Sequence, residues 1–205
     1  MIKEVIKTND FFVRFFFGSK GNEDLLLSFI NAIMIDSNFA TFKSVEILNP
    51  FNLKDKIDNK ESIVDLKAIT ENGVVVIIEI QTYSTKNFFE RTLYYWSKNY
   101  SSVLKKGKGY EELKPVISIN LVNDFLFDKT DNRMHTCYLL KEKKSNKILT
   151  DHIQLHYVEL PKFNKKSNIK KELRNWILFL KSNKEEDMSQ LLKDDTIFEK
   201  AINKY

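Results

Sequence analysis

Residues 64–81 read VDLKAITENGVVVIIEIQ, and this stretch decides the fold. It divides into two β-strand patterns around TENG at residues 70–73, where Asn-Gly is a strong hairpin signal because both residues tolerate a positive φ angle. The second strand, Val74–Ile80, is almost wholly apolar and β-branched. A run that is apolar on both faces is typical of a strand in the middle of a covered sheet. The sequence therefore predicts a hairpin at the centre of a layered sheet.

Acidic side chains stand on both strands of this hairpin. Glu79 closes the apolar run, where a buried carboxylate is unfavourable unless a metal or a cation compensates it. Because strand side chains alternate, Glu79 shares a face with Gln81, and Asp65 shares a face with Lys67. If the strands align these pairs, two acids converge in a hard oxygen site suited to Mg²⁺, with Mn²⁺ as the alternative ion. The structural alternative is that Asp65 caps a turn and Glu79 forms an ion pair with Lys67.

The composition is that of a globular protein with one domain, or one domain with an appendage. The chain has 205 residues, of which 42% are hydrophobic and 30% charged, enough to bury a sizeable core. Its formal net charge of +5 fits a polyanion partner without requiring one. The single cysteine, Cys137, excludes an internal disulfide and a cysteine-based zinc cluster. No apolar run reaches the roughly 20 residues that span a bilayer, so we expect a cytoplasmic protein with no membrane partner.

The segment before the hairpin predicts two helices and a strand. The first helix covers residues 10–18, DFFVRFFFG, and its phenylalanines favour a buried docking helix over a base-stacking surface, because only Arg14 interrupts them. Apolar residues at helical spacing predict a second helix over residues 22–35. Alternating residues predict a strand within residues 42–53.

A long helix is predicted directly after the hairpin, from Ser84 or Thr85 as its cap to Gly107. A polar stripe along it can reach a phosphate held at the acids, although a solvated polar face explains the same pattern. The residues of the stripe that we expect to contact DNA are Arg91, Tyr95 and Lys98. Its predicted core residues are Phe88, Leu93, Trp96, Tyr100 and Leu104.

The remaining chain predicts strands at residues 116–122, 134–140 and 153–160, then a helix at 172–182 and a short helix from Thr196. The histidines show no metal-ligand spacing, and we interpret them as structural. Two of them are four residues apart in a predicted strand and should share a face. The three histidines are His135, His152 and His156.

Several different short groups of residues lie along nearly the whole chain. Their order is a more specific signal than any one group. They are Asp10 with Phe15 and Phe17-Gly18, Phe29-Ile30-Asn31-Ala32-Ile33, Val64-Asp65-Leu66, Ile78-Glu79-Ile80-Gln81, Arg91 with Leu93-Tyr94-Tyr95, Lys98-Asn99-Tyr100, Gly109-Tyr110 with Leu113-Lys114-Pro115-Val116, and His156 with Glu159-Leu160-Pro161-Lys162-Phe163. This ordered set resembles the PD-(D/E)XK nuclease family transposases, also called the Rpn or recombination-promoting nuclease family.

The resemblance implies an α/β, restriction-endonuclease-like fold, in which helices flank a mixed central sheet and further helices follow at the C-terminus. The nuclease-like domain would cover residues 1–163, and residues 164–205 would form a helical extension packed on the same domain. The active site would lie on the hairpin.

The resemblance also implies roles for individual residues. Asp65 and Glu79, with the Ile80 carbonyl, would bind Mg²⁺. Enzymes of this kind place a lysine two residues after the glutamate, where it orients or deprotonates the attacking water. Here that position holds Gln81, a variant that the family uses widely; an amide can orient water but cannot act as a base at neutral pH. From strand alternation we infer Lys67 as the substitute cation.

The implied function is that of a Mg²⁺-dependent endonuclease that hydrolyses DNA in recombination or in mobile elements. Asp10 and Glu23 are candidates for an additional outer acid. We expect a bacterial-type cytoplasmic protein, with association with the nucleoid and a homodimer as further expectations. Two alternatives stay open. One is a non-catalytic DNA-binding or regulatory relative that kept the fold, and the other is a protein-interaction module.

Overall fold

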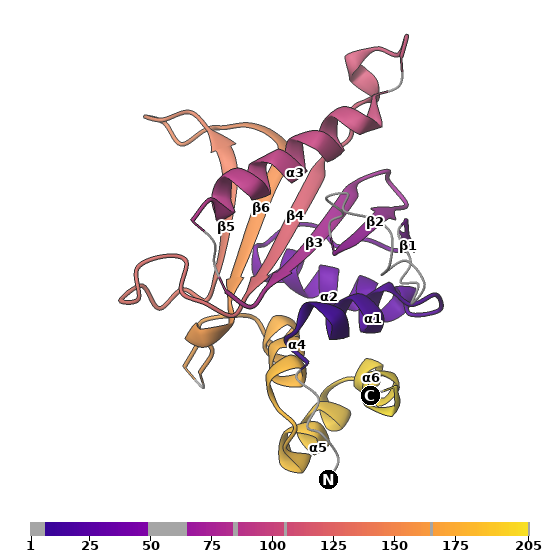
Figure 1. Ribbon diagram of the computed structural model, residues 1–205, viewed down its shortest axis with the longest axis vertical. Coiled ribbons are helices and arrows are strands. Elements are labelled where there is room, and N and C mark those ends of the chain that lie inside the picture. Colours follow the sequence, from indigo (N-terminus) through magenta and orange to yellow (C-terminus); the bar gives the residue numbers. More distant parts are fainter. Residues whose placement is uncertain (1–6, 49–64, 84–85, 105, 165, 205) are drawn as a thin grey trace.

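The computed structural model describes residues 7–48, 65–83, 86–104, 106–164 and 166–204. A six-stranded sheet in the order β1-β2-β3-β4-β6-β5 forms its centre (Figure 1). β3, β4 and β6 are parallel, and the outer pairings are antiparallel, so the predicted mixed sheet is confirmed. The strands are β1 (Val45–Ile47), β2 (Leu66–Thr70), β3 (Val75–Gln81), β4 (Val116–Val122), β5 (His135–Lys141) and β6 (Ile148–Glu159).

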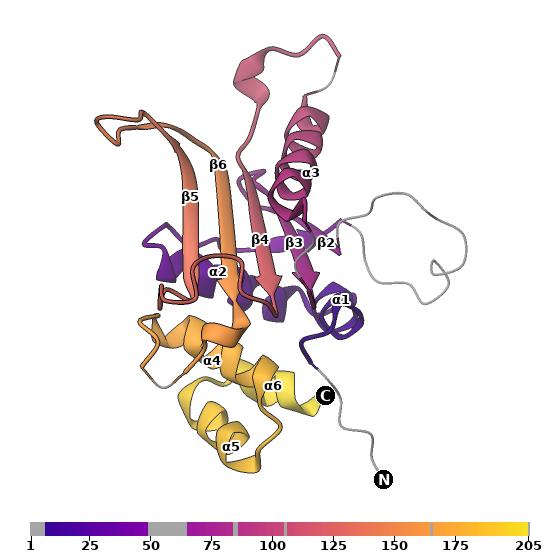
Figure 2. The ribbon, with the colours of Figure 1, turned by 60° about the vertical axis from the view of Figure 1, so that its left-hand side comes forward.

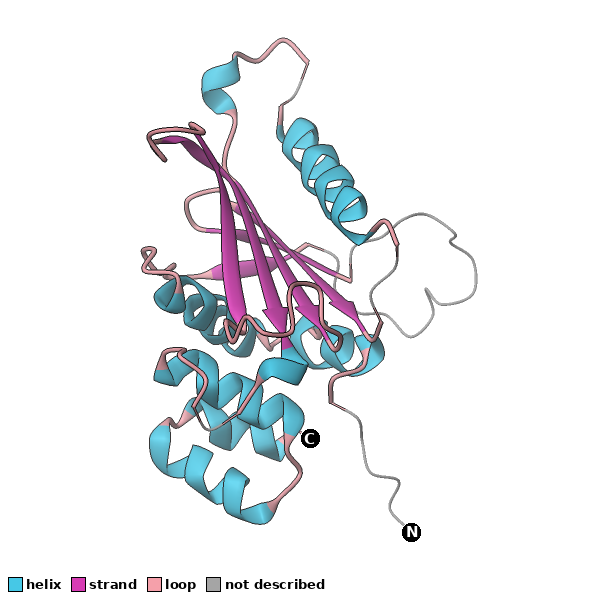
Figure 3. Ribbon diagram, turned by 90° about the vertical axis from the view of Figure 1, so that its left-hand side faces the viewer, coloured by secondary structure: helices cyan, strands magenta, loops and turns pink. Residues whose placement is uncertain are grey.

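Helices cover both faces of the sheet, with α3 on one side and the remaining helices on the other and below it (Figures 2 and 3). Single turns of 3₁₀ helix, η2 (Tyr110–Glu112) and η3 (Leu160–Lys162), precede β4 and follow β6. Over the ranges that the structure describes, no helix combines the length and apolarity needed to cross a bilayer. The α-helices are α1 (Asp10–Gly18), α2 (Glu23–Asp36), α3 (Phe88–Val103), α4 (Lys171–Lys181), α5 (Glu185–Asp194) and α6 (Ile197–Asn203).

The predicted hairpin is present as β2 and β3, which pair antiparallel with Leu66 opposite Ile78. The turn differs from the expected one. The Thr70 N–H donates to the Val74 carbonyl at 3.0 Å, and φ is positive at Gly73 (79°), whereas Asn72 is not among the described residues with a positive φ. This is the pattern of a three-residue loop that ends in a left-handed residue, which needs only the glycine.

β3 is buried on both faces, as its continuous apolar run predicts. Val76 and Ile78 join the main core with α1 and α2, whereas Val75 and Ile77 pack beneath α3. By strand alternation, Glu79 then lies on the α3 face. The carboxylate therefore stands at the end of a core strand between two helical layers.

α3 corrects one predicted core residue and shifts the predicted ends. It is flanked by Asn87 and Leu104, and the expected caps at residues 84–85 lie outside the described residues. Leu93 is wrong as a core residue, because 47% of its surface is exposed. The stripe that faces the sheet contains Phe88, Thr92 and Asn99, and Leu93 lies one residue beyond it.

The aromatic helix α1 is confirmed as a docking helix. Asn9 caps it by accepting the Phe12 N–H at 2.6 Å. Phe16 and Phe17 are buried and pack against the ring of Trp176 in α4, with centroids 6.5 and 5.3 Å away. Phe11 and Phe15 of the same helix remain exposed.

The C-terminal helices share the main core with α1 and α2 instead of forming a core of their own. The predicted apolar side of α4 is buried, with Leu173, Trp176, Ile177 and Leu180 all nearly inaccessible. The predicted short helix is α6. α5 was not predicted; among its described residues only Leu191 is fully buried, so the helix has little apolar pattern to indicate it. The domain boundary at residue 163 stays a prediction.

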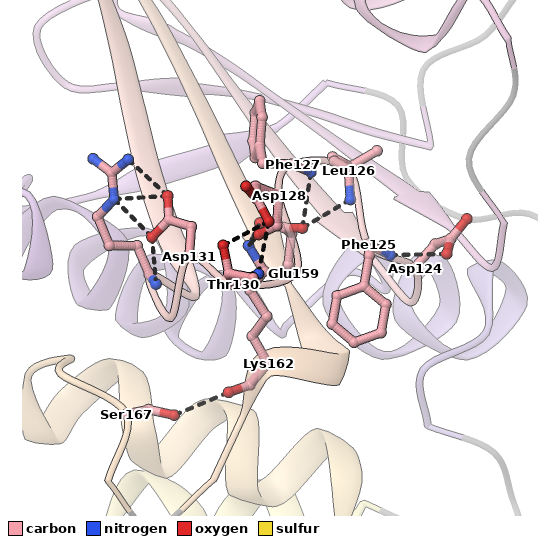
Figure 4. A network of polar contacts seen from close by, with 11 residues as sticks. Asp124, Phe125, Leu126, Phe127, Asp128, Thr130, Asp131, Glu159, Lys162 and Ser167 are labelled. Atoms are coloured by element: carbon pink, nitrogen blue, oxygen red, sulfur yellow. Dashed lines mark hydrogen bonds and ion pairs between the residues drawn. The ribbon is translucent and has the colours of Figure 1, made fainter.

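A buried carboxylate holds the loop between β4 and β5 (Figure 4). Glu159 accepts the N–H groups of Leu126 at 2.7 Å and Phe127 at 3.2 Å. Its other oxygen lies 2.8 Å from Lys162 Nζ, which also donates to the Asp128 carbonyl at 3.2 Å. Although Lys162 is a charged residue, its side chain is only 4% exposed and belongs to this network.

Glu159→Ala is predicted to lower the free energy of unfolding by about 3–5 kcal/mol, because it leaves the Lys162 ammonium buried without its partner. Urea titration measures the change. Glu112→Ala is the control, since Glu112 pairs with Lys108 at the surface and should contribute less than about 1 kcal/mol. Equal effects of the two substitutions would contradict this account of the loop.

Candidate active site

The structure brings Asp65 and Glu79 together at the open end of the hairpin. The Asp65 N–H donates to Glu79 Oε1 at 3.2 Å, and the Ile80 N–H donates to Asp65 Oδ2 at 2.8 Å. Each carboxylate therefore accepts a backbone hydrogen bond from the other strand. These reciprocal bonds hold the two acids side by side, next to the paired part of the hairpin.

Glu79 is an unusually weak acid in this setting. Burial, followed by the neighbouring Asp65 carboxylate, raises the pKa of Glu79 to about 8. The hydrogen bond from the Asp65 N–H and the charges of Arg91 and Arg14 act in the opposite direction. Because Glu79 is only 7% exposed, water cannot stabilise the negative charge of its carboxylate. The site therefore favours either a proton or a cation at Glu79.

The two acids fit a divalent cation that takes the rest of its ligands from water and substrate. The predicted ligand set is Asp65, Glu79 and the Ile80 carbonyl, all oxygen donors of the kind that Mg²⁺ prefers. Within the described ranges, no group of three or more His, Cys, Asp or Glu side chains is arranged to hold a metal. A site with one or two carboxylates, water and phosphate oxygens is nevertheless common for Mg²⁺.

Gln81 and Lys67 lie close to the acid pair but differ in setting. The Gln81 amide donates to the Ile80 carbonyl at 3.2 Å, so its nitrogen is fixed beside a predicted metal ligand. Lys67 stands opposite Ile77, two residues or about 7 Å along β2 from Asp65. Burial lowers the pKa of the Lys67 ammonium. Both residues are half-buried, which places them at the edge of the site.

The charges of two arginines from different helices act on Glu79 and favour its ionised form. Arg91 was predicted as a DNA contact, and its guanidinium lies 5.3 Å from the ring centroid of Phe88. Arg14 of α1 was not predicted, although it is the one cation in the aromatic helix. Arg14 Nε and Arg91 Nη2 are both buried without a hydrogen-bond acceptor. No pattern in the sequence connects Arg14 with Arg91 or with Glu79.

The other predicted DNA contacts take different places on α3. Tyr95 is half-buried and packs on the cluster of Val75, Ile77 and Val116. Lys98 is exposed, about two turns along the helix from Arg91. The charge of Arg91 acts on Glu79, and the DNA contacts through Arg91, Tyr95 and Lys98 all stay predictions.

The candidates for an outer acid are not brought to the pair by any contact in the described part of the chain. Glu23 lies in the first turn of α2, where its neighbour Asp24 bonds to Lys200 of α6 and Asn22 bonds to Lys204 just after that helix. The side chain of Asp10 lies outside the described residues. Both roles stay predictions.

A buried polar group that the sequence did not indicate fixes α3 over the site. Asn120 stands beside Glu79 in the parallel pairing of β3 and β4 and is fully buried. It donates to Ser118 Oγ at 3.1 Å and to the His156 carbonyl at 3.0 Å, and its amide oxygen lies 3.3 Å from Thr92 Oγ1. Since Thr92 follows Arg91, this bond fixes the part of α3 that carries Arg91.

The histidines lie apart from the acids, in two different environments. His135 bonds to Asp36 at 2.6 Å and to His156 at 3.1 Å, beneath α2. His152 instead bonds to Tyr100 of α3 at 2.9 Å. The expected shared face of His152 and His156 is therefore wrong. A register shift between β5 and β6 falls opposite residues 150–154 and interrupts the alternation of side chains there.

Comparison with models of protein families finds one description that fits nearly the whole chain. Residues 7–205 match the model described as PD-(D/E)XK nuclease family transposase. No curated protein and no solved structure matches the chain.

Glu79→Gln is predicted to stabilise the metal-free protein, and more so at pH 8–9 than at pH 5. The unfolded chain releases the Glu79 proton near the ordinary pKa of 4.5, whereas the folded chain holds it to about 8, so wild-type stability falls as pH rises between these values. The amide carries no proton to lose.

Thermal unfolding in EDTA across this pH range measures the effect. Glu71→Gln is the control, because backbone N–H groups of Lys43 and Ser44 lower the pKa of that exposed carboxyl. Its replacement should give no stabilisation at any of these pH values. A difference between Glu79→Gln and wild type that does not change with pH would contradict the prediction.

Proposed function

This chain belongs to the PD-(D/E)XK nuclease family transposases, and we propose that it is a metal-dependent endonuclease that hydrolyses phosphodiester bonds of DNA. The observation that supports this proposal is the contact between Asp65 and Glu79 at the end of a core strand. A buried acid whose pKa is raised toward 8 is unfavourable for the fold alone, and such groups concentrate at functional sites. The proposal includes a role in recombination or in mobile elements.

In this mechanism, Asp65, Glu79 and the Ile80 carbonyl would hold Mg²⁺ or Mn²⁺. The ion, when bound, lowers the pKa of a water ligand and neutralises charge on the phosphate. Glu79 would hold the ion in its ionised form, so this carboxyl would give up its proton when the ion is bound. Because Asp65 and Glu79 are already held by backbone hydrogen bonds, little reorganisation accompanies binding.

The attacking water is placed by the residues that follow the acids. Gln81 keeps its amide nitrogen on the Ile80 carbonyl, and its amide oxygen is then available to orient the water. An amide accepts no proton at neutral pH. Lys67 is our candidate for the basic group, because burial lowers the pKa of its ammonium and brings the neutral amine closer to physiological pH.

The DNA partner is bound through α3 in this proposal. Arg91 contacts the phosphate backbone from beside the acids, and Lys98 and Tyr95 contact it farther along the helix. The alternative that rests on a specific observation is a DNA-binding relative without cleavage activity, because Gln81 replaces the lysine that catalytic members of such enzymes place there. A homodimer remains an expectation within the same proposal.

Asp65→Asn and Glu79→Gln are each predicted to lower the rate of plasmid cleavage in Mg²⁺ by more than about 100-fold. Residues that only support a metal ligand already cost 10–100-fold when replaced, and a ligand should cost more. Glu46→Gln, an exposed carboxylate on the neighbouring β1, is the matched control and should cleave at the wild-type rate. Full activity in either acid variant would remove this site from consideration.

Cleavage and binding assays on the wild-type protein distinguish a nuclease from the binding-only alternative. Cleavage of supercoiled plasmid that EDTA abolishes identifies the nuclease. Salt-sensitive DNA binding without cleavage in either Mg²⁺ or Mn²⁺ identifies the binding-only relative.

Lys67→Met is predicted to lower kcat by about 100-fold or more, the range for loss of a general base. Adding Gln81→Lys to this variant should restore part of the rate, because it returns a lysine to the position two residues after Glu79. Lys43→Met removes an exposed lysine near β1 and serves as the control. Wild-type kcat in Lys67→Met would exclude Lys67 as the basic group.

A further inference from the structure

Two buried histidines, His135 and His156, lie in direct contact beside the end of α2. His135 Nδ1 lies 2.6 Å from Asp36 Oδ2, and His135 Nε2 lies 3.1 Å from His156 Nδ1. The side chain of His135 is 2% exposed, and His156 is fully buried. Because water cannot solvate a charge here, each proton that this histidine pair binds must be stabilised by neighbouring groups.

Asp36 joins three elements at the histidine pair. It is the last residue of α2, and its Oδ2 bonds to His135, the first residue of β5. Its Oδ1 accepts the N–H of Lys170, the residue before α4, at 2.5 Å. α2 and α4 also pack against each other in the main core. One carboxylate thus connects the sheet with the adjoining ends of both helices.

The contacts of the neutral histidine pair determine which ring nitrogens carry hydrogen. An ionised carboxylate only accepts, so His135 Nδ1 carries a hydrogen for Asp36. The Nε2 of a neutral His135 is then an acceptor, and it receives the Nδ1 hydrogen of His156. His156 Nε2 is left without a hydrogen and faces the thiol of Cys137, whose Sγ lies 3.7 Å away.

The pair can bind one proton without losing any of these contacts. The proton binds at His156 Nε2, while the hydrogen between the rings moves from His156 Nδ1 to His135 Nε2. Ser37 Oγ, 3.4 Å from His156 Nδ1, is compatible with both arrangements because a hydroxyl donates and accepts. The positive charge then lies on His135, next to the Asp36 carboxylate.

A second proton is incompatible with the contact between the rings. It would place a hydrogen on both nitrogens that face each other across 3.1 Å, and two cationic rings would adjoin. Burial, followed by the charge of His135, accordingly lowers the pKa of His156 well below its ordinary value. The rings must separate before His156 can become a cation.

Other charged groups near the pair do not supply the missing compensation. On β5, burial raises the pKa of the Cys137 thiol to about 11, so it stays neutral. A cavity of about 480 Å³ beside His135 is lined by Asp131, Arg133 and Lys166. Asp131 and Arg133 pair with each other at 2.7 Å, and Lys166 adds a positive charge. At the start of α4, the side chain of Lys170 is exposed and also positive.

We propose that Asp36, His135 and His156 form an acid-sensitive junction, which holds α2, β5 and the start of α4 together with one bound proton or none and opens when a second proton binds. The junction lies apart from Asp65 and Glu79 and does not depend on nuclease activity. It makes the attachment of α4 to the sheet a function of pH.

Urea unfolding at pH 7.5 and 5.5 gives the first measurement. The unfolded chain charges both histidines of the pair near the ordinary pKa of 6.5, whereas the folded chain charges at most one. Stability is therefore lost as pH falls, and this one-proton difference should lower the folding constant about tenfold between the two pH values. His156→Gln should remove this loss, because its amide does not titrate.

His152→Gln is the matched control, because His152 bonds to Tyr100 of α3 and not to the pair. It should retain the acid loss that His156→Gln removes. Glu79 also changes its protonation in this range, with the opposite effect on stability, but it contributes equally to all three proteins. The wild-type pH dependence in His156→Gln would overturn the proposal.

Amide hydrogen exchange of the wild-type protein tests the opening itself. The protection factor of the Lys170 N–H, which bonds to Asp36, should fall about tenfold from pH 7.5 to 5.5, by the same one-proton difference. The Thr70 N–H, bonded to Val74 in the hairpin, is the control and should keep its protection. Lys170 protection that does not change with pH would overturn the proposal.

Nitrogen NMR of the histidine rings in the wild-type protein follows the protons. We expect the His156 hydrogen on Nδ1 while the pair is neutral and on Nε2 once His135 is charged. A His156 that becomes a cation while its contact with His135 persists would overturn the proposal. The exchange and NMR measurements use wild-type protein, so they decide the question even if His156→Gln does not fold.

Discussion

The reciprocal hydrogen bonds between Asp65 and the end of β3 are the constraint on which the rest of the site depends. They hold two carboxylates at a buried strand end, where burial and mutual repulsion raise the pKa of Glu79 to about 8. Such an arrangement is costly for folding. It is tolerated because the hairpin lies within a large core that covers both faces of β3.

The residues around the acids either carry a positive charge or hold the neighbouring helices and strands in place. Arg14 and Arg91 approach from α1 and α3, on different faces of the sheet, and neither completes its hydrogen bonds within the described chain. Asn120, fully buried in the neighbouring strand, ties α3 to the sheet through Thr92. The result is a polar site at the end of β3, between the sheet and the helices on its two faces. Apolar packing in the core, away from the acids, sets the geometry of this site.

Local signals predicted the parts of this protein that depend on neighbouring residues. The hairpin, the buried β3 and the two acids followed from strand alternation and an Asn-Gly turn, and the docking of α1 followed from its phenylalanines. The errors arose where a long-range contact changed a local pattern. Leu93 has helical spacing for a core position, yet the stripe against the sheet runs through Thr92. His152 and His156 have strand spacing for one face, yet a register shift separates their surroundings.

The sequence by itself determined the central hairpin and the pair of acids, because apolar periodicity and turn chemistry act over a few residues, and its resemblance to the nuclease family implied the mixed sheet. Only the tertiary structure decided which cations accompany those acids. Arg14 and Arg91 are far apart in the chain, and no periodicity links them. The charges of both act on Glu79 because α1 and α3 each bury an apolar side against the sheet near the end of β3.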